Sequence, residues 1–189
     1  MDSALIVSFS DKSTEYLTKI LQKASVKDID SVSDAGKARR VLIDKDYDLC
    51  IVNSPLPDEF GANLARDIAV KKTSQVILLV KSEVFDEISY RVEEYGVITI
   101  AKPINNSLLW NALRLASATS KKIKAIREEN LKLMQKIEDI RIVDRAKCIL
   151  ISNLSMTEAE AHRYIEKQAM DMRLPKRKVA EEILKIYEY

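Results

Sequence analysis

Short apolar runs alternate with amphipathic segments along the first 117 residues of the chain. Residues 4–7, 48–52, 76–80 and 97–100 are almost unbroken apolar runs rich in β-branched side chains. Such runs are typical of strands buried on both faces of a parallel sheet. Residues 13–24 and 35–44 lie between runs and place apolar side chains at helical spacing instead. This alternation predicts an α/β fold with a doubly wound parallel sheet, in which ligands bind at the C-terminal ends of the strands.

Polar residues that follow two of the predicted strands form recognisable motifs. Residues 47–53 read Tyr-Asp-Leu-Cys-Ile-Val-Asn, with Pro57 and Gly61 downstream, and Lys102 precedes Pro103 after the last run. In these positions the chain resembles the receiver domain of response regulators. The resemblance covers residues 1–118 and implies a five-stranded, flavodoxin-like domain.

The resemblance fails at the positions that carry receiver chemistry. It places Asn53 at the phospho-acceptor aspartate, and Ser8 and Phe9 at the acidic pair that holds the metal. Val80 stands at the Ser/Thr switch position and Thr99 at the aromatic one. Aspartate phosphorylation needs a carboxylate nucleophile and a Mg²⁺ ion held by carboxylate oxygens. The sequence therefore predicts a pseudo-receiver that acts by binding and dimerisation, without a metal or other cofactor.

Two residues beside this degenerate site leave alternatives open. Asp11 is a carboxylate nearby in sequence, although it lies beyond the usual acidic pair. If Asp11 or another carboxylate took over from Asn53, the domain would remain a phosphorylation switch. Lys102 matches the receiver lysine, and we expect it to form a hydrogen bond with Asn53.

Residues 119–142 have a helical pattern that contains neither Gly nor Pro. A repeat at spacings of three and four is made up of Ile123, Ile126, Asn130, Leu133, Ile137 and Ile140. This is the a/d seam of a coiled coil, and a polar residue at an a position, here Asn130, fixes the register of a parallel pair. We therefore predict a homodimer through this linker helix. The alternative is that the stripe packs against the chain's own receiver-like domain.

Residues 143–189 carry an ordered set of helix motifs. An Arg-Ala-Lys run at 145–147 lies on a first helix, and Thr157 followed by Glu160 has the pattern of a capping box that begins a second. Ala-Met at 169–170 and Val-Ala at 179–180 follow in order. One stripe of the second helix is formed by Ala161, Tyr164, Ile165, Gln168 and Ala169. These features predict three packed helices.

The same motifs resemble the ANTAR domain, a three-helix RNA-binding module of bacterial transcription antiterminators. One departure is visible, because Leu154-Ser155 stand where the family's loop carries His-Gly before its Leu-Ser. The resemblance implies a transcription antitermination regulator that binds hairpins in nascent RNA as a dimer.

The distribution of charge is compatible with an RNA partner. Residues 119–189 carry 16 Lys and Arg against 12 Asp and Glu, whereas residues 1–118 carry 15 against 17. This excess permits RNA binding without requiring it. We assign the RNA contacts to Arg145, Lys147, Arg163, Lys167, Arg173, Lys176, Arg177 and Lys178. Tyr164, Tyr187 and Tyr189 could stack on unpaired bases, or belong to the core and the tail.

Several other classes of protein are disfavoured. The sequence shows no Ser/His/Asp or Cys/His arrangement, phosphate-binding Gly loop or metal-ligand cluster, so we expect no enzymatic activity. Cys50 and Cys148 are expected to be free and buried, and His162 to be a packing or surface residue. The lack of a signal-like start or an apolar run of about 20 residues favours a cytoplasmic location.

The main alternative function is a protein-interaction adaptor of a signalling pathway that does not bind nucleic acid. In either case a sensor or regulatory protein is a candidate partner.

Overall fold

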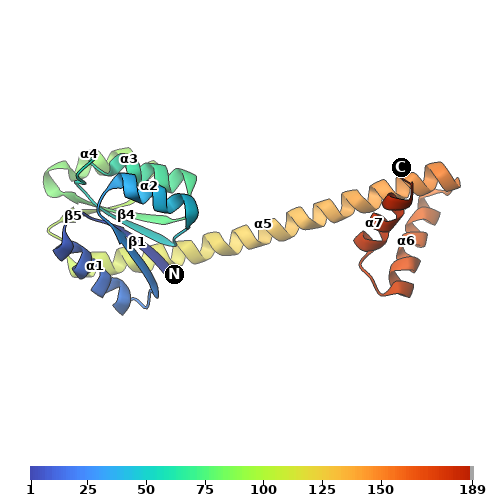
Figure 1. Ribbon diagram of the computed structural model, residues 1–189, viewed down its shortest axis with the longest axis horizontal. Helices are drawn as coiled ribbons and strands as arrows, with labels where there is room; N and C mark the ends of the chain where they lie inside the picture. The colour runs from blue at the N-terminus through green and yellow to red at the C-terminus, as the bar shows by residue number, and fades with distance from the viewer. Residues whose placement is uncertain (188–189) are drawn as a thin grey trace. The chain divides into compact units, whose positions relative to one another are not determined.

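The computed structural model describes residues 1–187, and the chain divides into two compact units, Met1–Ala125 and Ile126–Tyr189. The first unit holds a parallel five-stranded sheet with strand order β2-β1-β3-β4-β5 (Figure 1). Its strands are β1 (Ser3–Val7), β2 (Asp28–Val32), β3 (Leu49–Asn53), β4 (Gln75–Lys81) and β5 (Ile98–Lys102). The predicted doubly wound α/β fold is confirmed.

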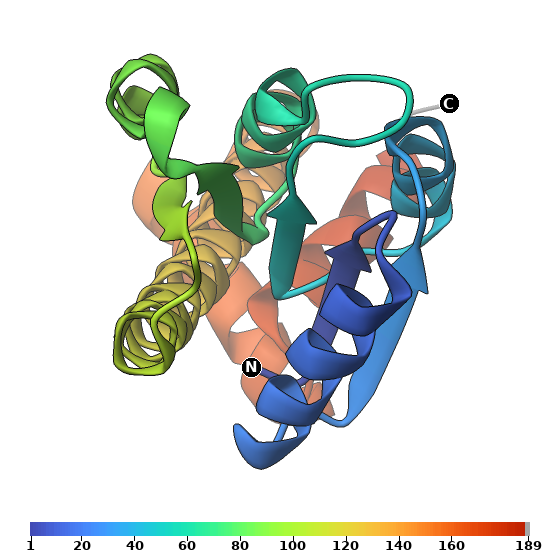
Figure 2. The same ribbon diagram turned by 90° about the vertical axis from the view of Figure 1, so that its left-hand side faces the viewer.

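Helices cover both faces of this sheet (Figures 1 and 2). Those on one face are α2 (Ala35–Asp44), α3 (Ala62–Lys71) and α4 (Phe85–Val92), and α4 is flanked by the short 3-10 helices η1 (Ser82–Val84) and η2 (Glu93–Tyr95). Those on the other face are α1 (Asp11–Lys23) and the first turns of α5 (Asn106–Leu154). Both faces of the sheet are therefore buried.

The two-sided burial explains the apolar runs in the sequence. Alternate side chains of a strand point to opposite faces of its sheet. Leu5 and Val7 accordingly belong to the core under α2, α3 and α4, whereas Ala4 and Ile6 belong to the core under α1 and α5. A strand buried on both sides has no solvent-facing position, so its sequence does not alternate between apolar and polar residues.

Strand β2 is the strand that the apolar runs do not reveal. Its sequence, Asp-Ile-Asp-Ser-Val, contains three polar residues, and none of its residues is fully buried. It lies at the edge of the sheet and pairs only with β1. Charged side chains are common on edge strands, and the Asp30 carboxylate accepts hydrogen bonds from Lys45 and Tyr47, both at 2.6 Å.

The buried carboxylate of Asp48 connects the start of β3 to the first residues of the chain and to α5. Its oxygens lie 2.5 Å from the backbone nitrogen of Asp2, 3.4 Å from that of Ser3 and 2.5 Å from Nζ of Lys124. Burial by itself raises the pKa of Asp48, but Lys124 and the two N–H groups outweigh burial, so the pKa is lowered. The ionised carboxylate therefore stabilises the unit above the carboxyl's unfolded-state pKa, and this contribution is lost as pH falls through the lower folded-state value.

Asp48→Asn is expected to lower the free energy of unfolding of the N-terminal unit by about 1–3 kcal/mol at neutral pH, the scale of a hydrogen bond to a charged group. The difference from the wild type should shrink as pH falls through the lowered folded-state pKa of Asp48, where the wild-type carboxyl becomes protonated. Trp110 is the only tryptophan and lies in this unit, so urea unfolding followed by its fluorescence measures the effect.

Asp46→Asn is the matched control for Asp48→Asn. Asp46 pairs with Lys72 at the surface, where an ion pair contributes less than about 1 kcal/mol. An equal loss of stability in Asp48→Asn at neutral and acid pH would contradict the role given to the Asp48 carboxylate.

The second unit is a three-helix bundle. It consists of the last part of α5, α6 (Glu158–Met172) and α7 (Lys176–Tyr187). Its core is formed by Ala146, Leu150, Ala161, Ile165, Ala169, Val179, Ala180 and Ile183. Half of these residues are alanines, whose small side chains let neighbouring helices approach closely. The three helices predicted from the sequence are present.

Helix α6 begins and ends with recognisable caps. Thr157 Oγ1 accepts a hydrogen bond from the Glu160 backbone at 3.3 Å, and Glu160 Oε2 accepts one from the Thr157 backbone at 2.8 Å. This is the predicted capping box. At the other end, Arg173 has the left-handed conformation (φ 54°), and Leu174 N–H bonds to the Ala169 carbonyl at 3.0 Å. Among the helices of residues 1–187, none is long and apolar enough to cross a membrane.

Candidate functional sites

The degenerate phospho-acceptor site lies at the C-terminal end of β3. Asn53 is buried there, and its Nδ2 donates a hydrogen bond to Ser8 Oγ at 2.9 Å. Two neutral groups are thus bonded to each other where a receiver would hold carboxylates. Phe9, at the second acidic position, is 68% exposed.

The two switch positions lie on neighbouring strands. Val80 is fully buried in β4. Thr99 lies in β5, and its buried Oγ1 has no hydrogen-bond partner within residues 1–187.

The expected hydrogen bond between Lys102 and Asn53 is wrong. Nζ of Lys102 donates instead to the backbone carbonyl of Ser54, the residue after Asn53. Because Asn53 carries no negative charge, it does not attract the ammonium group more strongly than a nearby carbonyl. Burial lowers the pKa of Lys102, and the positive charge of Lys81 lowers it further.

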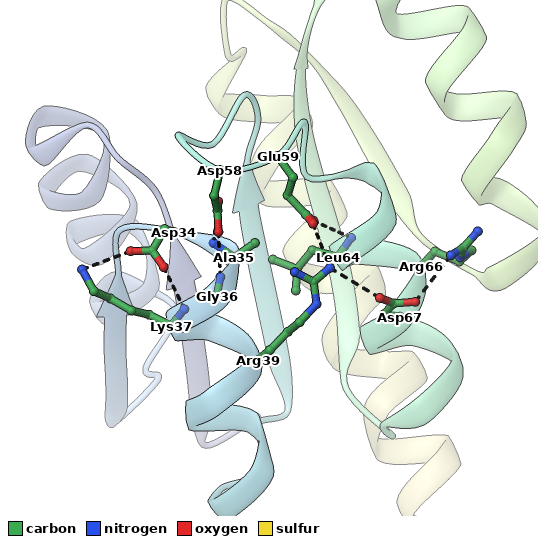
Figure 3. Close-up of polar contacts among 10 residues, drawn as sticks. All are labelled: Asp34, Ala35, Gly36, Lys37, Arg39, Asp58, Glu59, Leu64, Arg66 and Asp67. Atoms are coloured by element: carbon green, nitrogen blue, oxygen red, sulfur yellow. Dashed lines mark hydrogen bonds and ion pairs between the residues drawn. The ribbon is translucent and has the colours of Figure 1, made fainter.

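The loop that follows Asn53 is held against the start of α2 by Asp58 (Figure 3). The Asp58 carboxylate accepts hydrogen bonds from the backbone N–H groups of Ala35 at 3.0 Å and Gly36 at 2.8 Å. Asp34, the N-cap of α2, accepts a third from Lys37 N–H at 2.8 Å. The first N–H groups of a helix lack partners within the helix and favour negative charge. Two carboxylates thus occupy the N-terminus of α2.

Glu59 anchors the same loop to α3. One of its oxygens accepts a hydrogen bond from Leu64 N–H at 3.0 Å, and the other lies 2.9 Å from Nη2 of Arg39 (Figure 3). The same Arg39 nitrogen reaches Asp67 at 3.5 Å. We call the contacts of Asp58 and Glu59 the loop latch. They fix residues 54–61 to both neighbouring helices.

The latch was not apparent from the sequence. Asp34 before Ala-Gly-Lys has the pattern of an N-cap, but no local signal names Asp58, which lies more than twenty residues away, as the partner of the same helix end. Asp11, the carboxylate that could have replaced Asn53 as phospho-acceptor, lies exposed at the start of α1. Within residues 1–187, no group of three or more His, Cys, Asp or Glu side chains is placed to hold a metal ion.

Four of the eight cations assigned to RNA are engaged in ion pairs of the C-terminal unit. Lys176 pairs with Glu166 at 2.5 Å, and Lys178 with Glu181 at 2.9 Å. Arg177 bonds both Asp139 and Glu181 at 2.7 Å. The fourth, Lys147, pairs with Asp144 at 2.8 Å and Glu158 at 3.0 Å.

Lys147 also lies elsewhere than expected. An RNA contact needs an exposed side chain, but that of Lys147 is only 16% exposed. Glu158 at the start of α6 draws it inward, because the carboxylate offers a charged partner close to the helix junction. Lys147 thus joins α5 to α6 within the C-terminal unit.

The remaining cations are exposed. Arg163 and Lys167 lie on α6 and Arg173 at its C-terminal cap, and these three form no hydrogen bond or ion pair with another described residue. Arg145 is exposed too, although it has an interaction within the chain. The predicted set therefore separates into four cations that pair with carboxylates of the unit, of which Lys176 and Lys178 are also exposed, and cations that face solvent.

Some residues differ from expectation in burial. Tyr164, for which the sequence allows either base stacking or a place in the core, is 39% exposed at the edge of the buried stripe of α6. Tyr187 is exposed at the end of α7, and Tyr189 lies outside the described residues. Cys50 is buried as expected, but Cys148 is exposed on α5.

The predicted dimerisation seam lies along the middle of α5. Ile126 is 49% exposed and Ile137 is 52% exposed, with Leu133 and Ile140 similar. Ile123 is partly buried in the N-terminal unit, where it lines a hollow with Leu115 and Thr119. Apart from Ile123, the apolar side chains of the seam are uncovered in a single chain.

A solved structure identifies the class of the N-terminal unit. The signal receiver domain of an HD domain-containing protein from Pseudomonas fluorescens Pf-5 superimposes with a TM-score of 0.59 at 22% identity. The match covers 66% of this chain and 92% of that domain. The unit therefore has the receiver fold.

The C-terminal unit matches a known domain family. Residues 131–184 match the ANTAR domain. The transcriptional regulatory protein PdtaR from Mycobacterium tuberculosis is 27% identical over 168 residues, which are 89% of this chain and 82% of PdtaR. The aliphatic amidase regulator from Pseudomonas aeruginosa is 29% identical over 93 residues, 49% of this chain and 46% of that protein. The chain therefore joins a domain with the receiver fold to a segment that matches the ANTAR domain, and it is similar to these two regulators.

Proposed function

We propose that this chain regulates transcription by antitermination, binding hairpins in nascent RNA as a dimer through its ANTAR domain. The observation that supports this most directly is the ANTAR match over residues 131–184, on a bundle that presents Arg163, Lys167 and Arg173 to solvent. Sequence-specific RNA recognition targets unpaired loop bases, while Lys and Arg hold the phosphates. Such binding does not need the receiver-like domain to be chemically active.

The test is binding to an RNA that contains two hairpins, measured at several salt concentrations. Affinity should fall as salt rises, because each phosphate contact releases counterions. Binding should also favour particular loop sequences. Absence of RNA binding would leave the adaptor function, in which the C-terminal helices bind a protein, as the better account.

Dimerisation is proposed from the seam on α5. A helix with exposed Ile126, Leu133 and Ile137 at a and d positions of a heptad repeat gains most by pairing with an identical helix in parallel register. Two copies of the chain would then present two ANTAR domains to a pair of hairpins. The domain boundaries that follow are 1–118 for the receiver-like domain, 119–142 for the linker and 143–189 for the ANTAR domain.

We further infer that the receiver-like domain responds to a protein partner in place of phosphorylation. Asn53 and Ser8 present neutral groups where a receiver needs carboxylates, and the latch carboxylate of Asp58 is engaged at the N-terminus of α2. The exposed ring of Phe9 beside this site is suited to contact with a protein.

Incubation with acetyl phosphate and Mg²⁺ is expected to produce no phosphorylated protein. An amide is a poor nucleophile, and neither Ser8 nor Phe9 supplies a charge to bind the metal. Mass spectrometry of the intact protein measures this, and beryllofluoride should leave the melting temperature unchanged. Stoichiometric aspartyl phosphate, at Asp11 or elsewhere, would show that the domain remains a phosphorylation switch.

A further inference from the structure

We propose that the ANTAR unit reads RNA through one face of α6, defined by Arg163, Tyr164 and Lys167, with Tyr164 stacking on an unpaired base. We call these three residues the α6 face. The inference rests on the proposed RNA-binding function and assigns that function to one helix and one aromatic ring.

The arrangement of charge separates α6 from the start of α7. Lys176, Arg177 and Lys178 are each paired with a carboxylate of the same unit. A phosphate that approached them would meet those carboxylates as well, and an RNA contact would have to replace an existing ion pair. The start of α7 therefore attracts a polyanion weakly.

Arg163 and Lys167 are not held in ion pairs in this way. Neither forms an ion pair or hydrogen bond with another described residue. Glu160, one turn before Arg163, interacts with it electrostatically, but the Glu160 carboxylate forms its hydrogen bonds with the N–H and the hydroxyl of Thr157, each at 2.8 Å. The cationic stretch lies in the middle of the helix, between Glu158 and Glu160 in the first turn and Asp171, one turn after Lys167.

Helical spacing places the three side chains together. Ala161, Ile165 and Ala169 form the buried side of α6. Residues three and four positions apart are neighbours on a helix surface, about 5–6 Å apart at Cβ. Lys167 is therefore adjacent to both Arg163 and Tyr164 on the outer surface.

The position of Tyr164 suits it to base stacking. Its ring is 39% exposed, and its hydroxyl makes no hydrogen bond with another described residue. Aromatic side chains in RNA-binding proteins stack on splayed bases, and neighbouring cations hold the backbone of the same strand. An aromatic ring with Lys167 one turn further along the helix and Arg163 beside it in the chain matches the chemistry of a nucleotide, which joins a flat base to a phosphate.

The probe for the experiment is a two-hairpin RNA whose loop sequences are selected from a randomised pool by the wild-type protein. Tyr164→Leu should weaken binding roughly 5- to 100-fold without changing its salt dependence. Tyr164→Phe should remain within about threefold of the wild type, because stacking needs only the ring. Full-length protein is used throughout, and melting temperatures are measured on the same samples.

The cations are tested by charge removal on two helices. Arg163→Gln and Lys167→Gln should each weaken binding roughly tenfold and reduce the slope of log affinity against log salt by about 0.7–1. Lys185→Gln is the matched control. It removes the same charge from an exposed position on α7, and should change neither affinity nor slope appreciably.

The outcomes distinguish this inference from the proposed function. Failure of the wild-type protein to select any RNA overturns both. Selection of RNA with unchanged affinity in the Tyr164 and cation variants overturns the α6 face alone. A loss in Lys185→Gln equal to that in Lys167→Gln also overturns it, because binding would then follow total charge. Loss confined to the α6 variants, at wild-type melting temperature, supports it.

Discussion

Replacing Ile126 and Ile137 together by Asp is expected to convert the protein from a dimer to a monomer. In the proposed coiled coil, both side chains would enter the apolar seam between two helices. Two carboxylates there would have to be buried without partners, which costs on the order of several kcal/mol per protomer. Two separate chains, in which these carboxylates are hydrated, therefore have a lower free energy than a dimer that buries them. Analytical ultracentrifugation at micromolar concentration measures the change.

Leu131→Asp is the matched control for the seam. Leu131 is an exposed apolar residue on the same stretch of α5, but it lies outside the a and d positions. We expect it to leave the dimer intact. A monomeric wild-type protein would reject the coiled coil. Dissociation by Leu131→Asp would show that the contact follows a different face of the helix.

The second large effect is expected from Ile165→Ala in the ANTAR bundle. Ile165 is almost completely buried between α5, α6 and α7. Truncating a buried isoleucine costs about 2–5 kcal/mol through lost burial and the cavity that remains. A bundle of this size buries a small core and has little stability to lose. The C-terminal unit should therefore unfold largely or completely at ambient temperature.

Two spectroscopic probes separate the units in the Ile165→Ala variant. Far-UV circular dichroism should show reduced helix content, whereas Trp110 fluorescence should report a normal N-terminal unit. RNA binding should disappear with the helix signal. Ile186→Ala, at an exposed position of α7, is the control and should change stability by less than about 0.5 kcal/mol. Unaltered helix content in Ile165→Ala would contradict the packing described.

Much of the fold follows from patterns that are local in the sequence. The buried strands read as apolar runs, and the capping box at Thr157 and Glu160 marks the start of α6 within a few residues. Strand β2 has no apolar run from which it could be predicted, because an edge strand needs few buried side chains. What identifies it is its pairing with β1, which is a property of the whole sheet.

The candidate sites depend more on tertiary structure. Arg177 meets Asp139, a residue 38 positions away, and no spacing rule connects them. For this reason the sequence could name the cations of the ANTAR domain but could not separate those that pair with carboxylates of the bundle from those that do not. Tyr164 shows the same limit. Helical spacing placed it beside Ile165, but the width of the buried stripe is set by the neighbouring helices.

The loop latch has a consequence for molecular recognition. Association usually costs free energy when loops lose conformational freedom at the interface. Residues 54–61 are already fixed by Asp58 to α2 and by Glu59 to α3. A protein that docked on this loop would meet a surface with little freedom left to lose. A small interface could therefore bind tightly, and a partner of a different shape would be rejected, because the loop could not adapt to it without giving up its anchoring hydrogen bonds.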